Sequence, residues 1–340
     1  MFHEPHDTSL RNVSPAGSPP SPRQPRFVQI HHEDRNAVRD ELLDGLAAPA
    51  ARIAPKYLYD ELGSCLFQTI TELPEYYPTR TEAAIFEAHA QDMAARLPAG
   101  ATLVDLGAGN CRKAARLFGA LRPARYVAVD ISVDFLSACL HNLQQQHPTM
   151  DMVGVGMDFS QSLALPPEAG QPGDGPRVLF YPGSSIGNFN PAEARSFLRQ
   201  AHGACAGGGL LIGVDLIKDS AVLEPAYDDA LGVTAAFNRN LLRHVNRLAG
   251  TDFDIAHWRH VAFFNAQASR IEMHLEAVGP VTVRWPGHER RFASRERIHT
   301  ENSYKWKVDD FAALLADAGF SSPTVWTDEQ AWFAVLWAPA

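Results

Sequence analysis

Hydrophobic residues in the middle of the chain follow two alternating kinds of spacing. Short and nearly continuous apolar runs cover residues 101–106, 125–131, 152–159, 177–183 and 209–217. Between them, residues 111–121, 133–146 and 191–205 place apolar side chains three and four positions apart, as an amphipathic helix does. Apolar strands that alternate with helices are typical of a parallel sheet covered on both faces. The pattern therefore predicts a doubly wound α/β domain.

The chain before residue 101 departs from this rhythm. Its first 26 residues contain six prolines and few large apolar side chains. We therefore predict a disordered Pro/Ser-rich tail over residues 1–33, and we expect that removal of residues 1–30 leaves catalysis intact. Helical spacing follows over residues 34–48, 60–73 and 80–97. Residues 73–80 hold two prolines, which argues against a helix there.

A second change of pattern follows residue 217. Residues 224–232 and 233–250 are predicted as helices, and residues 270–279, 280–287 and 296–303 as antiparallel strands. The final residues return to a helix and two strands. We therefore predict an inserted α+β substrate-binding domain over residues 218–303. Residues 34–217 and 304–340 would form the first domain, with the last two strands joining its sheet.

Composition narrows the classes of function. Lys and Arg number 30 against 39 Asp and Glu, a formal charge of −9, whereas a protein that binds duplex nucleic acid needs a basic surface. The four cysteines lie far apart, which argues against a disulfide scaffold or a cysteine-rich zinc site. No apolar run approaches a membrane span, and no signal-peptide pattern opens the chain. We expect a cytoplasmic monomer with a small-molecule substrate and neither a nucleic-acid nor a membrane partner.

A glycine-rich turn follows the first predicted strand. Asp105-Leu-Gly107-Ala-Gly109 stands between a strand and a helix, where glycines let the backbone approach a nucleotide. Arg112 occupies the position of the third glycine of the dinucleotide fingerprint. The loop alone therefore fits a cofactor loop and an ordinary tight turn equally well.

Residues at the ends of the next two strands favour the interpretation of this turn as a cofactor-binding loop. Asp130 ends the second strand, where a carboxylate can accept both hydroxyls of a ribose. Asp158 and Phe159 end the third strand, where they suit an adenine amino group and ring. Lys113, in the first turn of the helix, fits either a solvated surface or the methionine carboxylate of the cofactor. This set resembles the Rossmann-like class I fold of S-adenosylmethionine-dependent methyltransferases more than a dehydrogenase.

Longer motifs narrow the family. They are KYLYDELGS (56–64), LPEYYPTRTE (73–82), GSSIGNF (183–189), GVDLIKD (213–219), AYDD (226–229), GVTAAFN (232–238), RIEM (270–273) and TENS (300–303). From about residue 50 to the C-terminus, the chain resembles the histidine Nα-methyltransferases of ergothioneine biosynthesis. The resemblance implies an enzyme that converts L-histidine to its trimethylbetaine, hercynine, in three steps, with S-adenosylmethionine as co-substrate and no metal.

The resemblance also implies roles for individual residues. Cofactor contacts fall on Gly107, Lys113, Asp130, Asp158 and Phe159. The catalytic positions are Tyr59, Gly183 and Asn188. The substrate-binding positions comprise Asn188 and Tyr227 at the carboxylate, Tyr76, Met273, Glu301 and Ser303 around the imidazole, Ser185 with Gly183 beside the amine, and Phe67 with Tyr59 in a lid-like N-terminal segment. Ser185 stands where many relatives have threonine. Serine keeps the hydroxyl of threonine but lacks its methyl group.

Elementary chemistry supports these residue types. Methyl transfer from a sulfonium is an in-line displacement, so a neutral and well-aligned amine matters more than a strong acid or base. An amide and a phenol can donate to the carboxylate of an amino acid, and a carboxylate can accept the imidazole N–H. Asn188 has no helix to cap, because Asn190-Pro191 with Glu193 forms the better helix start.

Other readings of these residues stay open. Glu301 can instead form a surface pair with Lys305, worth about 0–1 kcal/mol. His257-x-x-His260 has metal-ligand spacing, but nothing nearby completes a site. The rival functions are an N-methyltransferase for another aromatic amino acid or amine, and a non-catalytic sensor of S-adenosylmethionine or histidine. A carboxylate at Glu301 with Ser303 favours histidine, because an indole or phenol pocket needs no carboxylate.

Overall fold

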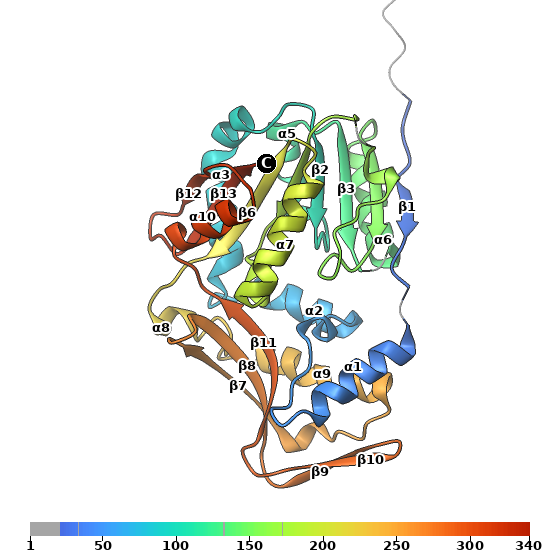
Figure 1. Ribbon diagram of the computed structural model, residues 1–340, viewed down its shortest axis with the longest axis vertical. Helices are drawn as coiled ribbons and strands as arrows, with labels where there is room; N and C mark the ends of the chain where they lie inside the picture. Colours follow the sequence, from blue (N-terminus) through green and yellow to red (C-terminus); the bar gives the residue numbers. More distant parts are fainter. Residues whose placement is uncertain (1–20, 33, 132, 172) are drawn as a thin grey trace, which may run out of the picture.

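The computed structural model describes residues 21–340 except 33, 132 and 172. Its largest element is an eight-stranded sheet of order β1-β4-β3-β2-β5-β6-β13-β12 (Figure 1). The strands are β1 (Arg26–Gln29), β2 (Thr102–Leu106), β3 (Arg125–Asp130), β4 (Asp151–Gly156), β5 (Arg177–Tyr181), β6 (Gly209–Asp215), β12 (Thr324–Thr327) and β13 (Phe333–Pro339). Strands β1 to β6 are parallel, and the β12–β13 hairpin joins β6 antiparallel. The predicted α/β class and the return of the C-terminal hairpin are confirmed.

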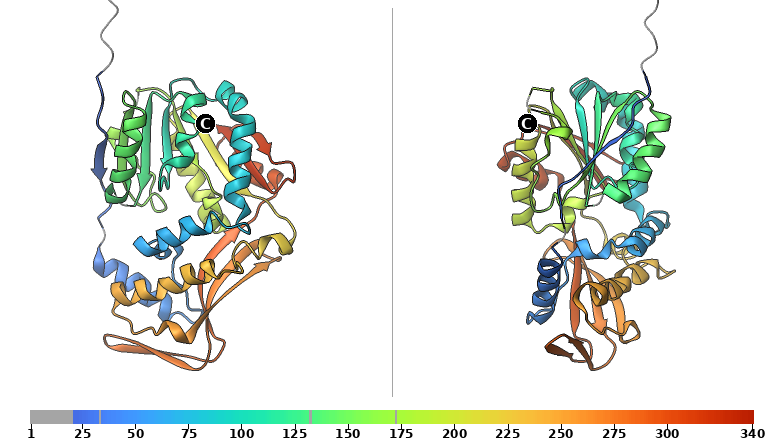
Figure 2. Two further views of the ribbon diagram at one scale, coloured as in Figure 1. Left: turned by 180° about the vertical axis from the view of Figure 1, so that it is seen from behind. Right: turned by 90° about the vertical axis from the view of Figure 1, so that its right-hand side faces the viewer.

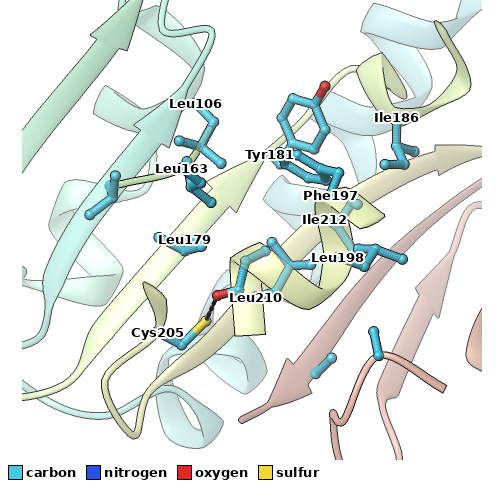
Figure 3. Close-up of a cluster of buried hydrophobic side chains, with 14 of the residues drawn as sticks. Leu106, Leu163, Leu179, Tyr181, Ile186, Phe197, Leu198, Cys205, Leu210 and Ile212 are labelled. Atoms are coloured by element: carbon cyan, nitrogen blue, oxygen red, sulfur yellow. Dashed lines mark hydrogen bonds between the residues drawn. The ribbon is translucent and has the colours of Figure 1, made fainter. Parts of the chain in front are cut away.

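Helices cover both faces of this sheet, as the edge-on view in Figure 2 shows. The helices α7 (Pro191–Ala204) and α10 (Val308–Asp317) pack on one face. The helices α3 (Tyr77–Arg96), α5 (Phe118–Leu121) and α6 (Val133–Gln146) pack on the other. Figure 3 shows the core beneath α7, where Phe197 and Leu198 meet Leu179, Leu210 and Ile212 of the central strands. Burial on both faces explains why these strands are almost wholly apolar.

The start of α7 follows the predicted capping pattern. The side chain of Asn190 accepts the N–H groups of Ala192 and Glu193, and the carboxylate of Glu193 accepts the N–H of Asn190. Pro191 stands at the first helical position, where no N–H is needed. Asn188 is therefore free of this duty, as the sequence indicated.

The predicted N-terminal tail needs correction at its end. Residues 1–20 of it lie outside the described residues, but Arg26–Gln29 form β1 at the edge of the sheet, parallel to β4. Phe27 packs close to Gly154 and Leu140, so this segment has the apolar anchor that its proline-rich surroundings obscured. A truncation through residue 30 removes a strand, so the expectation of no effect does not extend to it.

Three helical predictions also change. The helix α3 begins at Tyr77, inside the stretch judged too rich in proline, because Pro78 lies in its first turn, where no backbone bond is lost. The predicted helix over residues 111–121 is broken into α4 (Arg112–Ala115) and α5. Residues 224–232 form turns after the short α8 (Ser220–Leu223), and Asp229 caps the next helix by accepting the N–H groups of Val233 and Thr234.

The smaller half of the molecule is built around α9 (Val233–Ala249) and a three-stranded sheet of order β11-β8-β7. Its strands are β7 (Trp258–Asn265), β8 (Arg270–Ala277) and β11 (Arg297–Tyr304), with β9 (Val281–Trp285) and β10 (His288–Phe292) forming a separate hairpin. Strands β7 and β10 are additions to the predicted set. These elements match the predicted α+β character of residues 218–303.

The domain boundaries differ from the prediction at the N-terminal side. The helices α1 (Arg35–Ala47) and α2 (Glu61–Ile70) and the turn η1 (Pro55–Leu58) share one core with α9 and β8, not with the large sheet. Asp60 secures this arrangement, because its carboxylate caps α2 and accepts bonds from Asn240 and Arg247 of α9. Figure 1 shows α1 and α2 beside α9, below the sheet. The smaller half therefore combines two segments that are separated along the chain by strands β2 to β6.

Candidate active site

The carboxyl ends of β2, β3 and β4 bring the predicted cofactor residues to one edge of the sheet. Asp130, at the end of β3, accepts the N–H of Gly109 (3.0 Å) and the N–H of Ile131 (2.8 Å). Burial raises the pKa of Asp130, and these two backbone bonds oppose that effect. Gly107 and Gly109 both have positive φ, 72° and 51°, a conformation that favours glycine. The loop after β2 therefore wraps toward the carboxylate that ends β3.

The remaining cofactor candidates surround the same edge. The ring of Phe159 lies 3.7 Å from the position that a Cβ on Gly107 would take. The carboxylate of Asp158 accepts a bond from Gln161 (2.7 Å) and bonds from the hydroxyl and the N–H of Ser160 within its own loop. Asp158 is therefore part of a polar turn beside the ring of Phe159.

Lys113 has a partner that sequence reasoning missed. Its ammonium lies 2.7 Å from the carboxylate of Glu82, which is only 1% exposed. The other oxygen of Glu82 accepts the N–H of Gly183 at 2.6 Å. Glu82 thus joins the cofactor edge to the loop after β5, where the substrate candidates begin. The motif that contains Glu82 was recognised, but nothing in its spacing revealed this bridging position.

The ten residues predicted as catalytic or substrate-binding line one cavity between the large sheet and the smaller half. The lining consists of Tyr59, Phe67, Ile70, Tyr76, Gly183, Ser184, Ser185, Asn188, Ala226, Tyr227, Thr234, Phe237, Met273, Glu301 and Ser303. Five of these, Ile70, Ser184, Ala226, Thr234 and Phe237, were not predicted. Ile70 lies on α2, and Thr234 and Phe237 lie on α9. A position on the buried face of a helix does not by itself distinguish a cavity residue from a core residue.

Close backbone approach closes this cavity on one side. The short turn η3 (Ser185–Asn188) follows β5 and contacts β11 of the smaller half. A Cβ on Gly187 would lie 2.9 Å from the carbonyl oxygen of Tyr304, so only glycine fits at this contact. Gly183 and Ser184 precede the turn with positive φ, 77° and 58°. The hydroxyl of Ser184 accepts the N–H of Asp215 (2.9 Å), which fixes the turn to β6.

A β-bulge directs the two imidazole candidates into the cavity. Pairing between β11 and β8 shifts between His299 and Glu301, so that Glu301 lies opposite Met273. Without the bulge, strict alternation from the buried Ile298 would turn Glu301 to the outer face. With it, Glu301 (7% exposed) and Ser303 join the inner face, and His299 bonds Asn302 on the outer face.

Behind Ser303 lies a buried charged network, which we call the Asp215 network. It comprises Asp215, Lys218, Lys305 and Tyr77. Asp215 pairs with Lys305 (2.7 Å) and Lys218 (2.6 Å) and accepts the hydroxyl of Tyr77. Burial alone would raise the pKa of Asp215, but the two ammonium groups outweigh burial and lower it.

The Asp215 network reaches the cavity through two hydroxyl groups. Lys305 donates to Tyr227 (2.9 Å) and to Ser303 (2.8 Å), and these two hydroxyls lie 2.7 Å apart. Burial raises the pKa of Glu301 to about 7, although the charge of Lys305 and a bond from Asn188 oppose the rise. Burial also raises the pKa values of Tyr76 and Tyr227, so both are neutral phenols.

Two alternative readings of the sequence fail in the structure. Glu301 and Lys305 do not form a surface pair, because both are buried and Lys305 bonds Asp215, Ser303 and Tyr227. His260 bonds the carbonyl oxygen of Tyr227 and the amide of Asn238 instead of a metal. Across the described ranges, no cluster of three His, Cys, Asp or Glu side chains could hold a metal ion. Nor is any helix in that part of the chain long and apolar enough to cross a membrane.

Comparison with known proteins agrees with this geometry. A family described as histidine-specific, S-adenosylmethionine-dependent methyltransferases matches residues 38–340. A histidine N-alpha-methyltransferase of Mycolicibacterium smegmatis is 40% identical over 86% of this chain and 91% of its own length. One of Mycobacterium tuberculosis is 39% identical over 86% and 92%. An N-methyltransferase of Aspergillus flavus is more distant, 26% identical over 91% of this chain and 90% of its own length.

Proposed function

The chain belongs to the histidine-specific, S-adenosylmethionine-dependent methyltransferases, and from this we propose that it methylates the α-amine of L-histidine three times to give hercynine, in ergothioneine biosynthesis. One observation carries the choice of histidine. Glu301 and Ser303 line the same cavity as Asn188 and Tyr227, so groups suited to an imidazole and to a carboxylate face one volume. An imidazole offers one ring nitrogen to the carboxylate and a second to the hydroxyl, whereas an indole or a phenol has only one polar ring group and cannot engage both.

The residues at the carboxyl ends of β2 to β4 fit the co-substrate. Asp130 still has acceptor capacity after its two backbone bonds and suits the ribose hydroxyls. Phe159 offers an apolar face to the adenine ring, and Asp158 an acceptor to its amino group. Lys113 suits the methionine carboxylate, while Glu82 holds its ammonium toward Gly183. When bound, S-adenosylmethionine supplies an electrophilic methyl group on a sulfonium.

On the side of the methyl acceptor, the main role of the protein is to position the amino acid for transfer. Asn188 can donate to the substrate carboxylate with Tyr227 lining the same cavity, and Glu301 and Ser303 orient the ring. Gly183 and Ser185 form the wall beside the amine, while Tyr59, which is 39% exposed, and Phe67 close the mouth through an edge-to-face contact. Effective molarities of oriented reactions show that such alignment can account for much of a rate enhancement.

The three methyl groups are transferred one at a time. The lone pair of the neutral amine forms the new N–C bond while the S–C electron pair returns to sulfur. The first two products must each lose a proton before they react again, and we assign the nearby hydroxyl of Tyr59 to the path by which this proton leaves. After the third transfer the quaternary nitrogen has neither a proton nor a lone pair, so the sequence of transfers ends there.

Mass spectrometry of the amino acid tests this proposal directly. L-histidine incubated with the protein and S-adenosylmethionine should gain one, two and then three methyl groups and no fourth. L-tryptophan and L-tyrosine, offered in the same mixture, serve as competing acceptors. Methylation of either in preference to histidine would overturn the assignment, as would tight binding of both ligands with no turnover, which would indicate a sensor.

A further inference from the structure

Lys305 holds an unusual position next to the cavity. Its side chain is 0% exposed, and it lies behind the cavity wall without lining it. A buried ammonium costs several kcal/mol unless it is paired and fully hydrogen-bonded. Its three N–H groups have three partners, the carboxylate of Asp215 and the hydroxyls of Tyr227 and Ser303. All three donors are therefore used.

The bonds of Lys305 determine which way the two hydroxyls can donate. An ammonium has no acceptor, so both hydroxyls accept from it. Tyr227 and Ser303 also bond each other at 2.7 Å, so one of them gives its only proton to the other. The second hydroxyl keeps one proton. Lys305 and the partner hydroxyl lie on its other sides, so it can donate this proton into the cavity that both residues line. The Tyr227–Ser303 pair therefore presents a single donor to the cavity, whichever of the two provides it.

The carboxylate of Glu301 lines the same cavity and can accept a ring N–H. Counted together, Lys218 and Lys305 supply two positive charges and Asp215 and Glu301 two negative ones. A neutral ring keeps this buried set balanced, whereas an imidazolium ion adds an uncompensated charge. Tyr59 and Tyr76 also face the cavity, and the other lining side chains, from α2, η3, α9 and β8, carry no charge.

We infer that Lys305 is a positioning residue that makes the cavity accept the neutral imidazole of histidine in one tautomer. A neutral ring has one N–H for Glu301 and one bare nitrogen for the hydroxyl donor. An imidazolium has two N–H groups, one of which would point at the hydroxyl proton. The inference rests on the proposed function, because it concerns how that substrate is held.

Nitrogen NMR tests the inference by a signal that a purely structural role would not move. L-histidine labelled with ¹⁵N in the ring is bound to the full-length protein with S-adenosylhomocysteine at about pH 8, above the pKa of about 7 of Glu301, so that this carboxylate is ionised. The wild type should show one protonated and one bare ring nitrogen. In Lys305→Met, Glu301 loses its balancing charge and the hydroxyls are free to accept, so both ring nitrogens should be protonated.

Controls separate the possible failures. Lys307→Met removes an exposed lysine two residues away and should match the wild type. If Lys305→Met does not fold, Lys305→Leu likewise removes both the charge and the donors, and it should give the same doubly protonated ring. A doubly protonated ring in the wild type overturns the inference, and so does a variant ring identical to the wild-type ring. Absence of histidine binding to the wild type would refute the proposed function instead.

Discussion

The proposed cofactor edge of the sheet and the proposed amino-acid cavity are built in different ways. Gly107, Asp130 and Phe159 follow three successive parallel strands, and their side chains contact their own loops and nearest neighbours. The cavity takes residues from eight separate stretches, between Tyr59 and Ser303, and places an ionisable carboxylate against a buried charged network. The first site follows from topology, whereas the second depends on two halves of the molecule meeting correctly.

This difference has an energetic meaning. The carboxylate of Asp130 is held by backbone N–H groups that the strand–turn–helix geometry provides in any case. Burial raises the pKa of both carboxylates, and that of Glu301 reaches about 7 although the charge of Lys305 and a bond from Asn188 oppose the rise. Buried carboxylates with a shifted pKa are common at functional sites, where the surrounding structure holds them in place. The two regions should therefore respond differently to mutation.

The largest effect is expected at the cofactor edge. Asp130→Ala removes the acceptor for two ribose hydroxyls, and two lost charge-assisted bonds cost about 3 kcal/mol, or roughly a hundredfold in affinity. Calorimetry with S-adenosylhomocysteine should show this loss while histidine binding changes little. Asp134→Ala, which removes an exposed carboxylate in the same region, is the matched control. Unchanged cofactor affinity in folded Asp130→Ala would remove Asp130 from the site.

The cavity should show the reverse selectivity. Glu301→Ala combined with Ser303→Ala should raise the KM for histidine by about tens- to hundredfold, because the ring loses both partners. The same variant should narrow the preference for histidine over tryptophan, and its affinity for S-adenosylhomocysteine should stay near that of the wild type. Steady-state kinetics with both acceptors measures this. A variant that kept the KM and the preference would place the imidazole elsewhere.

The raised pKa of Glu301 predicts a stability effect with a definite sign. Burial raises this pKa from 4.5 to about 7, so the folded protein binds the proton more tightly than the unfolded chain does. This contribution is fully present below about pH 4.5 and is lost as pH rises through 7. Glu301→Gln lacks it and should gain about 2–3 kcal/mol relative to the wild type between those limits.

Urea unfolding at about pH 5 and about pH 8 measures this difference. The exposed Glu289→Gln is the control, and its stability relative to the wild type should not change with pH in this way. If Glu301→Gln followed the wild type at both pH values, the carboxylate would not be held at a cost, and the contrast between the two regions would weaken.

The smallest effect concerns the strand that the sequence concealed. The side chain of Gln29 accepts the N–H of Val133 (3.1 Å) and donates to the carbonyl oxygens of His31 and Ile131. It therefore holds the loop that follows Asp130. Gln29→Ala should weaken binding of S-adenosylhomocysteine a few-fold, at about 1 kcal/mol. The side chain of Arg26, on the same strand, donates to the distant Asp151. Arg26→Ala should therefore leave the affinity for S-adenosylhomocysteine unchanged.

The sequence alone determined the large sheet, apart from its edge strand β1, and the residue types of both proposed sites. Apolar runs mark the parallel strands because burial on both faces removes the usual polar alternation. The carboxyl ends of such strands share one edge, so Gly107, Asp130 and Asp158 could be assigned together from local positions. Family motifs supplied the members of the cavity, which no local pattern joins.

Only the tertiary structure decided how these parts are held. The helices α1 and α2 pack on α9. An amphipathic sequence predicts that one face of a helix is buried, but it does not predict which element covers that face. The bulge before Glu301 reverses the face that alternation from Ile298 would give, and a one-residue shift in pairing cannot be read from strand periodicity. Lys305 resembled a surface lysine in the sequence. It is buried because Asp215 and Tyr227, remote along the chain, and Ser303, two residues before it, satisfy all of its donors.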